Sequence, residues 1–367
     1  MLAMTAARKV SRFPGQFEMR RGGYLDRPVI AYETWGRLNE ARDNGILIFT
    51  GMSPSAHATS SPEDPASGWW EEMVGPSRPI NTRQYFVICI NSLGSCFGST
   101  GPASIDPATG RRYGVSFPVL SLEDVASAGK FVVDQFGIER LHTVVGPSMG
   151  GMTALAFAIL FPDKTRNLAL LSTAARSLPY SIAMRSLQRE LIRRDPAWEN
   201  GNYAPGAGPV NGMRLARKLG LMTYRSAREW EQRFGRERVD EERQTGDAFA
   251  LDFEIEAYLE AHAAKFIGQF DANSYLYLSR ASDLFDVAEH GGSVAAGLAR
   301  IRAERVLIIG VETDTLFPIA QQRELAGGLE KRGREVDLAE LPSIQGHDSF
   351  LVDMDRFRPV VAAFLNA

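Results

Sequence analysis

The chain has 367 residues, and 41 Lys and Arg against 44 Asp and Glu give a formal net charge of -3. Hydrophobic residues make up 44% and charged residues 23%, which is ordinary for a globular protein with a sizeable core. The charge balance argues against a dedicated nucleic-acid binder and gives no reason to expect an anionic membrane as partner. No apolar run reaches the ~18 residues that a membrane-spanning helix needs, and we expect no signal peptide.

Only two cysteines occur, Cys89 and Cys96, which is too few for a disulfide framework. We expect both to be free thiols in a protein of the reducing cytoplasm. No group of Cys and His residues has the spacing of a zinc site. We therefore expect neither a metal nor a resident cofactor.

In the first half of the chain, short apolar runs alternate with helical patterns. Apolar runs bounded by Gly, Pro or Asn predict buried strands at 46–49, 85–90, 143–145 and 168–171. A helix is predicted over 122–136, with a capping box at Ser121 and Asp124 and Gly137 just past its end. A second apolar helix follows Gly150 and stops at Pro162. This order predicts a mostly parallel sheet with helices on its faces.

The pattern changes between about residues 176 and 290, where strand-like runs are few and helical stretches are many. The alternation then resumes with a predicted strand at 306–310, a helix at 319–331, a strand at 336–341 and a closing helix at 354–365. The sequence therefore predicts an α/β core made of residues 1–175 and 291–367. Residues 176–290 are predicted to form an inserted helical lid.

A Gly-x-Ser-x-Gly motif, Gly146-Pro147-Ser148-Met149-Gly150, follows a predicted strand and opens a predicted helix. That context is the one in which the motif forms a tight turn presenting a nucleophilic serine. A β-carbon at either flanking glycine would collide with the turn. The N-terminus of the following helix would then favour a developing oxyanion near Ser148.

A serine nucleophile needs a base, and in this turn the partners follow in the chain order serine, acid, histidine. Asp314 follows the predicted 306–310 strand and His347 follows the 336–341 strand, which places both at the same sheet edge as Ser148. Asp314 has an alternative interpretation as a helix cap, in which case Glu312 is the reserve acid. His57 is the rival base, but it precedes the motif.

An oxyanion needs a second backbone donor besides the amide of Met149, and it normally comes from the loop after an early strand. That loop is Gly51-Met52-Ser53, which follows the predicted 46–49 strand. The amide of Met52 is the predicted donor, with Ser53 in reserve. The alternative is that Gly51 only ends the strand and the loop supplies no oxyanion donor.

Several segments extend this pattern, namely Asn91-Ser92-Leu93-Gly94, Gly98-Ser99-Thr100-Gly101-Pro102, Gly146–Met152, Asp314–Pro318 and Gly346-His347-Asp348. Together they resemble the homoserine O-acyltransferase family of α/β-hydrolase-fold enzymes, from about residue 25 to the end. The segments at 51–57, 178–183 and 185–194 are more similar to its L-serine O-succinyltransferase branch. The resemblance implies ping-pong transfer of an acyl group from acyl-CoA to a hydroxy amino acid. The favoured reaction uses succinyl-CoA as donor and L-serine as acceptor, for cysteine biosynthesis. An acetyl donor, and homoserine as acceptor for methionine biosynthesis, are the alternatives, and a homodimer is possible.

The resemblance also implies residues that hold the amino acid. Arg217 would bind its carboxylate, Tyr224 would line the pocket and Asp348 would hold the ammonium group. A zwitterion needs one fixed cation and one fixed carboxylate, and arginine grips a carboxylate in a fork. The alternatives are a solvated helix charge for Arg217 and a supporting loop contact for Asp348.

The lid is expected to keep water from the acyl-serine. Arg185, Arg189 and Arg193 recur every four residues and share one helical face. This stripe could meet CoA phosphates or an acyl carboxylate, but we favour a solvated face paired with Glu190. A serine esterase with the same triad and a non-catalytic binding protein are the competing interpretations of the whole chain.

Overall fold

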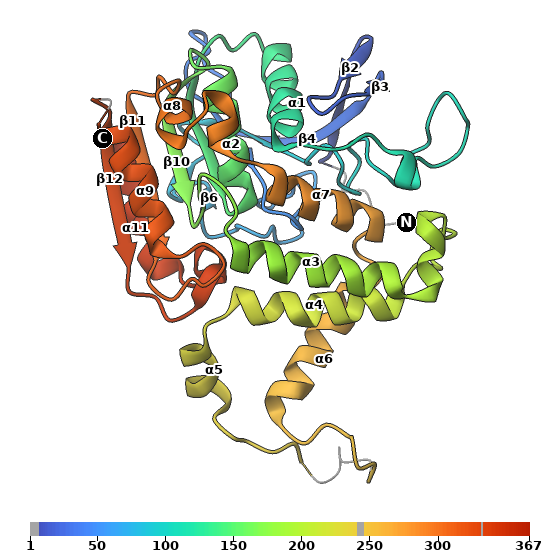
Figure 1. Cartoon of the computed structure of the whole chain (residues 1–367). Helices are drawn as coiled ribbons and strands as arrows, with labels where there is room; N and C mark the ends of the chain where they lie inside the picture. The colour runs from blue at the N-terminus through green and yellow to red at the C-terminus, as the bar shows by residue number, and fades with distance from the viewer. Residues whose placement is uncertain (1–6, 241–245, 332) are drawn as a thin grey trace.

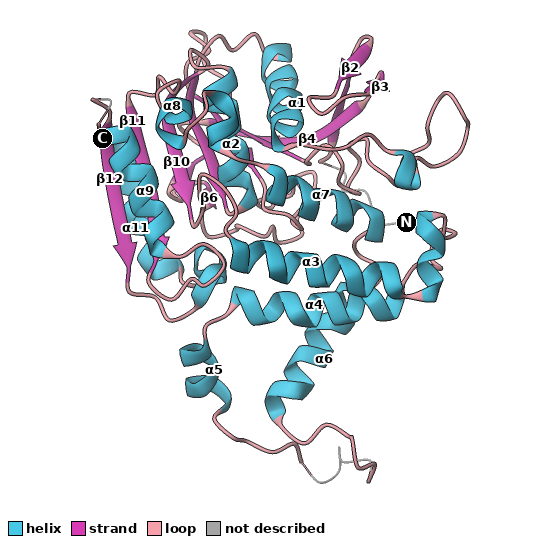
Figure 2. Ribbon diagram, viewed as in Figure 1, coloured by secondary structure: helices cyan, strands magenta, loops and turns pink. Residues whose placement is uncertain are grey.

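A mixed eight-stranded sheet runs through the centre of the molecule (Figures 1 and 2). The computed structural model describes residues 7–240, 246–331 and 333–367. The strand order is β1-β4-β8-β5-β9-β10-β11-β12; β4 is antiparallel to both of its neighbours, and the remaining pairs are parallel. These strands are β1 (Lys9–Arg12), β4 (Val29–Trp35), β5 (Gly45–Phe49), β8 (Phe86–Ile90), β9 (Leu141–Pro147), β10 (Thr165–Leu171), β11 (Arg305–Val311) and β12 (Glu335–Leu341). Two small sheets pair β2 (Gln16–Glu18) with β3 (Tyr24–Asp26) and β6 (Val74–Gly75) with β7 (Ile80–Asn81).

The six strands predicted from apolar runs are present as β5, β8, β9, β10, β11 and β12. Strands β1 and β4 were not predicted. Strand β4 mixes apolar residues with Glu33 and Thr34, so it lacks the continuous apolar run that marked the others. Its Glu33 is nevertheless buried, because His57 supplies a hydrogen-bond partner.

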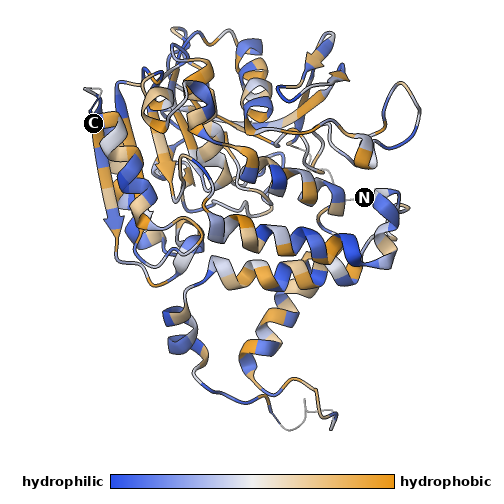
Figure 3. Cartoon of the chain, viewed as in Figure 1, coloured by the Kyte–Doolittle hydropathy of each residue, from blue (hydrophilic) through white to orange (hydrophobic). Residues whose placement is uncertain are grey.

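Helices cover both faces of the sheet. They are α1 (Leu122–Gln135), α2 (Met149–Leu160), α8 (Val294–Leu298), α9 (Ile319–Glu330), α10 (Ser349–Val352) and α11 (Met354–Asn366). Alternate residues of a strand point to opposite faces, so Leu47 and Phe49 pack in the core with α1 and α2, whereas Ile46 and Ile48 pack in the core with α11. Orange residues accordingly concentrate along the central strands in Figure 3. The predicted capping box at the start of α1 is confirmed.

Helices α3, α4 and α7 lie across the carboxyl edge of the parallel strands, and α5 and α6 project beyond α4, away from the sheet (Figure 1). They are α3 (Pro179–Arg194), α4 (Val210–Tyr224), α5 (Ala227–Phe234), α6 (Glu254–Phe266) and α7 (Ala272–Leu284). Helix α4 packs against both α3 and α6, and α3 also packs against α7. The described residues also form the short 3-10 helices η1 (Gly114–Ser116), η2 (Pro196–Gly201), η4 (Val287–His290) and η5 (Gly346–Asp348).

These five helices fall within the interval 176–290 that was predicted as the lid, of which residues 241–245 lie outside the described part. We call α3 to α7 the lid helices below. None of the described helices combines the length and the apolar character that a bilayer crossing requires.

Candidate active site

Ser148 occupies a strained turn between β9 and α2. Its backbone has φ 55° and ψ -124°, a conformation that side-chain-bearing residues rarely adopt. The turn is tight because its flanking glycines touch other backbone: a β-carbon at Gly146 would overlap the carbonyl of Gly150, and one at Gly150 would overlap the carbonyl of Phe49. The two glycines therefore permit the turn that projects the Ser148 hydroxyl above the sheet edge.

Three side chains from three strand ends meet above that edge. The Ser148 hydroxyl donates to Nε2 of His347 at 2.7 Å, and Nδ1 of His347 donates to Oδ2 of Asp314, also at 2.7 Å. Both His347 and Asp314 are buried, at 3% and 4% exposure. Ser148 follows β9, Asp314 follows β11 and His347 follows β12. The structure thus brings together the three residues that the sequence predicted as a triad.

The other oxygen of Asp314 fixes the carboxylate in place. Oδ1 accepts hydrogen bonds from the amides of Leu316 and Phe317 at 2.8 and 2.9 Å. These bonds form a local turn and not the helix cap that was the alternative interpretation of Asp314, because the N-cap of α9 is Pro318. Helix α9 itself begins after Pro318.

The two reserve candidates lie elsewhere. Glu312 is exposed at the surface. The two ring nitrogens of His57 lie 2.9 Å from Glu33 and 2.9 Å from the carbonyl of Ala66. Neither residue joins the Ser148 hydrogen-bond chain.

Charge balance around His347 sets its basicity. Burial lowers the pKa of this imidazole, but the charge of Asp314 and its hydrogen bond outweigh burial, so the pKa is raised above 6.5. A raised pKa means that the ring accepts a proton from the Ser148 hydroxyl more readily. The arrangement suits general-base catalysis near neutral pH.

The two predicted oxyanion residues line one cavity with the serine. Met52, Ser148 and Met149 all border a cavity of about 40 Å³. The loop that carries Met52 is held by Asn91, whose side-chain oxygen accepts from the amide of Ala56 at 2.7 Å. Asn91 was identified from the sequence only as part of a motif, and its hydrogen bond to the Met52 loop was not predicted.

Two of the residues predicted to bind the amino acid substrate, Tyr224 and Arg217, lie near His347. The ring of Tyr224 lies 6.2 Å from that of His347 between centroids. The guanidinium of Arg217 lies over the rings of Tyr224 and Phe266, at 5.6 and 4.6 Å, and no carboxylate among the described residues pairs with it. Arg217 is half-buried and its Nε has no hydrogen-bond partner in the described part of the chain, so the guanidinium can receive an anion.

Asp348 lies next to His347 in η5. Burial raises the pKa of this carboxyl, against the opposing effect of Arg225 and His347. Nε of Arg225 is 3.7 Å from Oδ2 of Asp348, while Nη1 donates to Gln345 at 2.8 Å. Arg225 was not predicted as a site residue. The available signal was a cationic residue directly after Tyr224, which was predicted to line the pocket.

The prediction of a solvated arginine face on α3 is wrong for Arg185 and Arg189, although Arg193 is exposed. Arg185 is only 7% exposed and borders the catalytic cavity, and Arg189 bonds to Asp283 of α7. Only Arg194 pairs with Glu190 at the surface, and Arg193 lies over the ring of Trp198. Helical spacing identified a shared face but could not show that α7 covers it.

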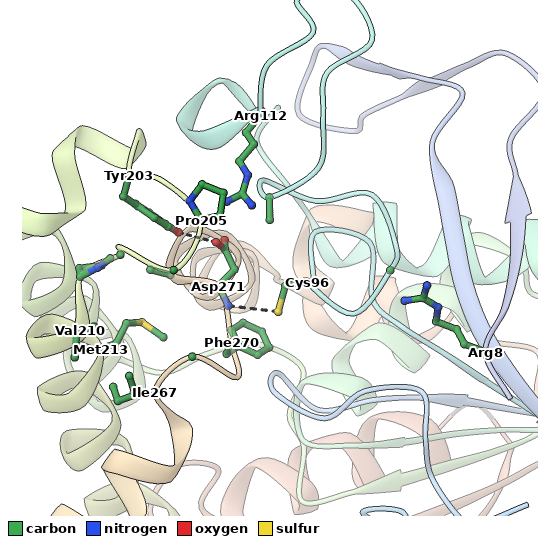
Figure 4. A pocket seen from close by; sticks show the side chains of 17 residues that line it. Arg8, Cys96, Arg112, Tyr203, Pro205, Val210, Met213, Ile267, Phe270 and Asp271 are labelled. Atoms are coloured by element: carbon green, nitrogen blue, oxygen red, sulfur yellow. Dashed lines mark hydrogen bonds between the residues drawn. The ribbon is translucent and has the colours of Figure 1, made fainter. Parts of the chain in front are cut away.

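A second, larger cavity of about 390 Å³ opens between the loop after β8 and the lid helices (Figure 4). Cys96, Tyr203, Met213 and Asp271 border it, with the Tyr203 hydroxyl donating to Asp271 at 2.7 Å. Cys89 and Cys96 are free thiols, as predicted. This cavity shares no lining residue with the catalytic cavity.

The sheet, the strained serine turn and the hydrogen-bonded trio together have the form of an α/β-hydrolase-fold enzyme, and residues 46–343 match the alpha/beta hydrolase fold family. A serine O-succinyltransferase of Litchfieldella anticariensis is 56% identical over 363 residues, covering 99% of each chain. An L-serine/homoserine O-acetyltransferase of Streptomyces lavendulae is 54% identical over 362 residues, covering 97% of each. The solved homoserine O-acetyltransferase of Bacillus anthracis superposes with a TM-score of 0.90 at 31% identity, covering 98% of each chain.

The chain therefore belongs to the homoserine O-acyltransferase family within the α/β-hydrolase fold, and it is an O-acyltransferase. The resemblance read from its motifs is confirmed.

Proposed function

We propose that this protein transfers a succinyl group from succinyl-CoA to the hydroxyl of L-serine, as a step of cysteine biosynthesis. The observation that carries the proposal is the Ser148-His347-Asp314 hydrogen-bond chain in a protein 56% identical to a serine O-succinyltransferase. Homoserine as acceptor and acetyl-CoA as donor, as in methionine biosynthesis, are the alternative, favoured by the names of the Streptomyces and Bacillus relatives.

The first half-reaction forms an acyl-enzyme. Oγ of Ser148 attacks the thioester carbonyl while its proton passes to Nε2 of His347. The amides of Met52 and Met149 stabilise the oxyanion of the tetrahedral intermediate. The carbon–sulfur bond then breaks, and the proton on His347 passes to the leaving sulfur, so that free CoA thiol departs and acyl-Ser148 remains.

The second half-reaction reverses these roles. The L-serine hydroxyl gives its proton to Nε2 of His347, and its oxygen attacks the acyl carbonyl. The bond to Oγ of Ser148 breaks, Oγ recovers the proton, and the O-acyl amino acid leaves. Asp314 holds the imidazole in one tautomer throughout and stabilises the imidazolium. No cofactor beyond the acyl-CoA substrate is required.

The amino acid would bind through three residues. The uncompensated guanidinium of Arg217 fits its carboxylate, Asp348 fits its ammonium group and Tyr224 closes the pocket between them. The lid helices would exclude water, so that the acyl group reaches the amino acid rather than being hydrolysed.

We further propose that the enzyme works in the cytoplasm as a homodimer. Leu187 of α3 and Leu215 and Met222 of α4 expose large apolar side chains on the lid helices. Sedimentation analysis of the purified protein measures the oligomeric state, and a monomer at all concentrations contradicts this part.

A two-by-two assay tests the function. Succinyl-CoA and acetyl-CoA are each combined with L-serine and L-homoserine, thiol release is followed, and the products are identified by mass spectrometry. We expect the fastest formation of O-succinylserine, and none with Ser148→Ala. Thiol release that is the same with and without either amino acid indicates an esterase-like hydrolase instead. Full turnover by Ser148→Ala contradicts the catalytic proposal altogether.

A further inference from the structure

A histidine outside the catalytic triad is held at both of its ring nitrogens. Nδ1 of His57 lies 2.9 Å from Oε2 of Glu33, and Nε2 lies 2.9 Å from the carbonyl oxygen of Ala66. His57 is 8% exposed, and Glu33, which belongs to β4, is 2% exposed. The imidazole is therefore fixed from two sides, by a strand of the sheet and by the segment that follows it in the chain.

These two contacts determine the protonation of the ring. A carbonyl oxygen and a carboxylate both only accept hydrogen bonds, so Nε2 and Nδ1 each carry a proton. Burial lowers the pKa of His57, but its hydrogen bonds with Glu33 and Ala66 and the charges of Glu33 and Asp64 outweigh burial and raise it above 6.5. His57 and Glu33 thus form a buried ion pair, and the ring keeps no lone pair with which to act as a base.

His57 ends the loop that carries a predicted oxyanion donor. Met52 lies five residues before His57 and borders the catalytic cavity together with Ser148. The backbone amide of Met52 has no hydrogen-bond acceptor among the described residues. This amide is therefore available to an oxyanion that forms at the acyl carbon.

The loop is anchored at its far end rather than at the donor. From Met52 to Pro54 it makes no hydrogen bond within the described part of the chain. The anchors lie at residues 55–57, where Nε1 of Trp69 donates to the carbonyl of Ser55 at 2.9 Å and where the His57 ring makes its two contacts. The place of the donor amide consequently depends on how this end is held.

We propose that His57 is a positioning residue for acyl transfer, because its ion pair with Glu33 and its bond to Ala66 fix the loop from which the Met52 amide meets the oxyanion. This inference rests on the proposed acyl transfer through Ser148 and on the proposed role of Met52. The competing explanation is that the buried pair of His57 and Glu33 contributes to stability alone.

His57→Gln is the main test variant. Its side-chain amide can replace Nε2 toward Ala66 but leaves Glu33 without a donor. Single-turnover acylation of Ser148 gives the rate constant at saturating donor and the donor concentration for half of that rate. Succinyl-CoA is one donor, followed by thiol release. A second donor, p-nitrophenyl acetate, is followed by nitrophenol release and contains no CoA.

We expect His57→Gln to lower the saturating rate constant by roughly 10- to 100-fold, because a displaced amide stabilises the oxyanion less. The half-saturating concentration of succinyl-CoA should stay within about threefold of the wild type, since the oxyanion is absent from the bound substrate.

His57→Asn is a milder variant at the same position. It keeps a donor near the place of Nδ1 and loses only the bond to Ala66, which is exposed and can bind water instead. Glu33 therefore stays paired, and the protein should fold. We expect the saturating rate constant to fall by roughly 3- to 10-fold, as for one lost hydrogen bond.

His290→Asn is the matched control. Nε2 of His290 lies 2.9 Å from Glu123, both side chains are buried, and neither residue borders the catalytic cavity. The substitution removes a histidine donor from a buried glutamate, as His57→Gln does. It should lower Tm and leave the acylation rate constant at the wild-type value.

A His57→Gln variant that loses Tm but acylates at the wild-type rate, like the control, overturns the proposal. A change confined to the half-saturating concentration overturns it as well. If His57→Gln does not fold, a wild-type rate constant in His57→Asn has the same meaning. No thiol release from succinyl-CoA or acetyl-CoA by the wild type contradicts the proposed function, whereas nitrophenol release still decides the role of His57. No release from any donor contradicts both.

Discussion

At the scale of single residues, charge decides what the site can hold. Burial lowers the pKa of His347 and Asp314 raises it, with a net rise. The guanidinium of Arg217 forms no ion pair with a carboxylate among the described residues. These two features lead to separate measurements, one on proton transfer and one on acceptor binding.

Acylation should depend on the protonation of His347. Only the neutral imidazole can take the Ser148 proton, so kcat/KM for the acyl donor should rise with pH as the ring loses its proton. Because the pKa of His347 is raised, the midpoint should lie above 6.5, the ordinary value for histidine. A pH profile of thiol release measures this. A midpoint at or below that value contradicts the charge balance described here.

Arg217→Met should weaken use of the amino acid without slowing acylation. The loss of a charge-assisted contact with a carboxylate should raise KM for L-serine by roughly 10- to 100-fold. The rapid first burst of thiol release should keep its amplitude, because it precedes acceptor binding. If the burst disappears as well, Arg217 has another role.

At the scale of elements, the turn between β9 and α2 depends on close backbone contacts.

Chain order and alternating patterns predicted six strands of the sheet and placed Ser148, Asp314 and His347 at one edge, because parallel strands share their carboxyl ends. Contacts between helices could not be predicted in this way. The partner of Arg185 is Asp283, 98 residues away on α7, and no local pattern reports such a distance.

Gly150→Ala should disrupt the serine turn. The added β-carbon would overlap the carbonyl of Phe49, and the strand and helix would have to move apart. We expect a loss of about 1–3 kcal/mol in the free energy of unfolding together with a large loss of activity. Thermal and urea unfolding measure the first effect.

Gly327→Ala is the matched control, since it lies inside α9 with no atom near its added β-carbon. It should be neutral or stabilising by about 0.5–1 kcal/mol with full activity. If both variants behave alike, the close contact at Gly150 is not what holds the turn.

At the scale of the whole molecule, a buried ionic cluster ties distant parts of the chain together. Glu123 at the start of α1 bonds to His290 in η4 at 2.9 Å and lies 3.2 Å from Arg20 in the segment between β2 and β3. The cluster therefore joins the N-terminal hairpin, the sheet-covering helix and the point where the chain returns from the lid helices.

Glu123→Gln should destabilise the protein in a pH-dependent manner. Burial raises the pKa of Glu123, but its hydrogen bond from His290 and the charge of Arg20 outweigh burial and lower it below 4.5. A lowered pKa gives stability that is present above the unfolded-state value and is lost as pH falls through the folded-state value. The difference in Tm between wild type and variant should thus be largest near neutral pH and shrink in acid. A constant difference at all pH values contradicts this role.

Arg185, Arg217 and Tyr224 all project from α3 and α4, while Ser148, Asp314 and His347 follow strands of the sheet. In the proposed function, Arg217 and Tyr224 would bind the amino acid from the helical layer, whereas Asp348 would bind it from the sheet edge next to His347. Substitutions on α3 and α4 would then change the substrate contacts while leaving the Ser148-His347-Asp314 hydrogen-bond chain in place. This separation gives a reason why close relatives carry different acyl and amino-acid names on one framework.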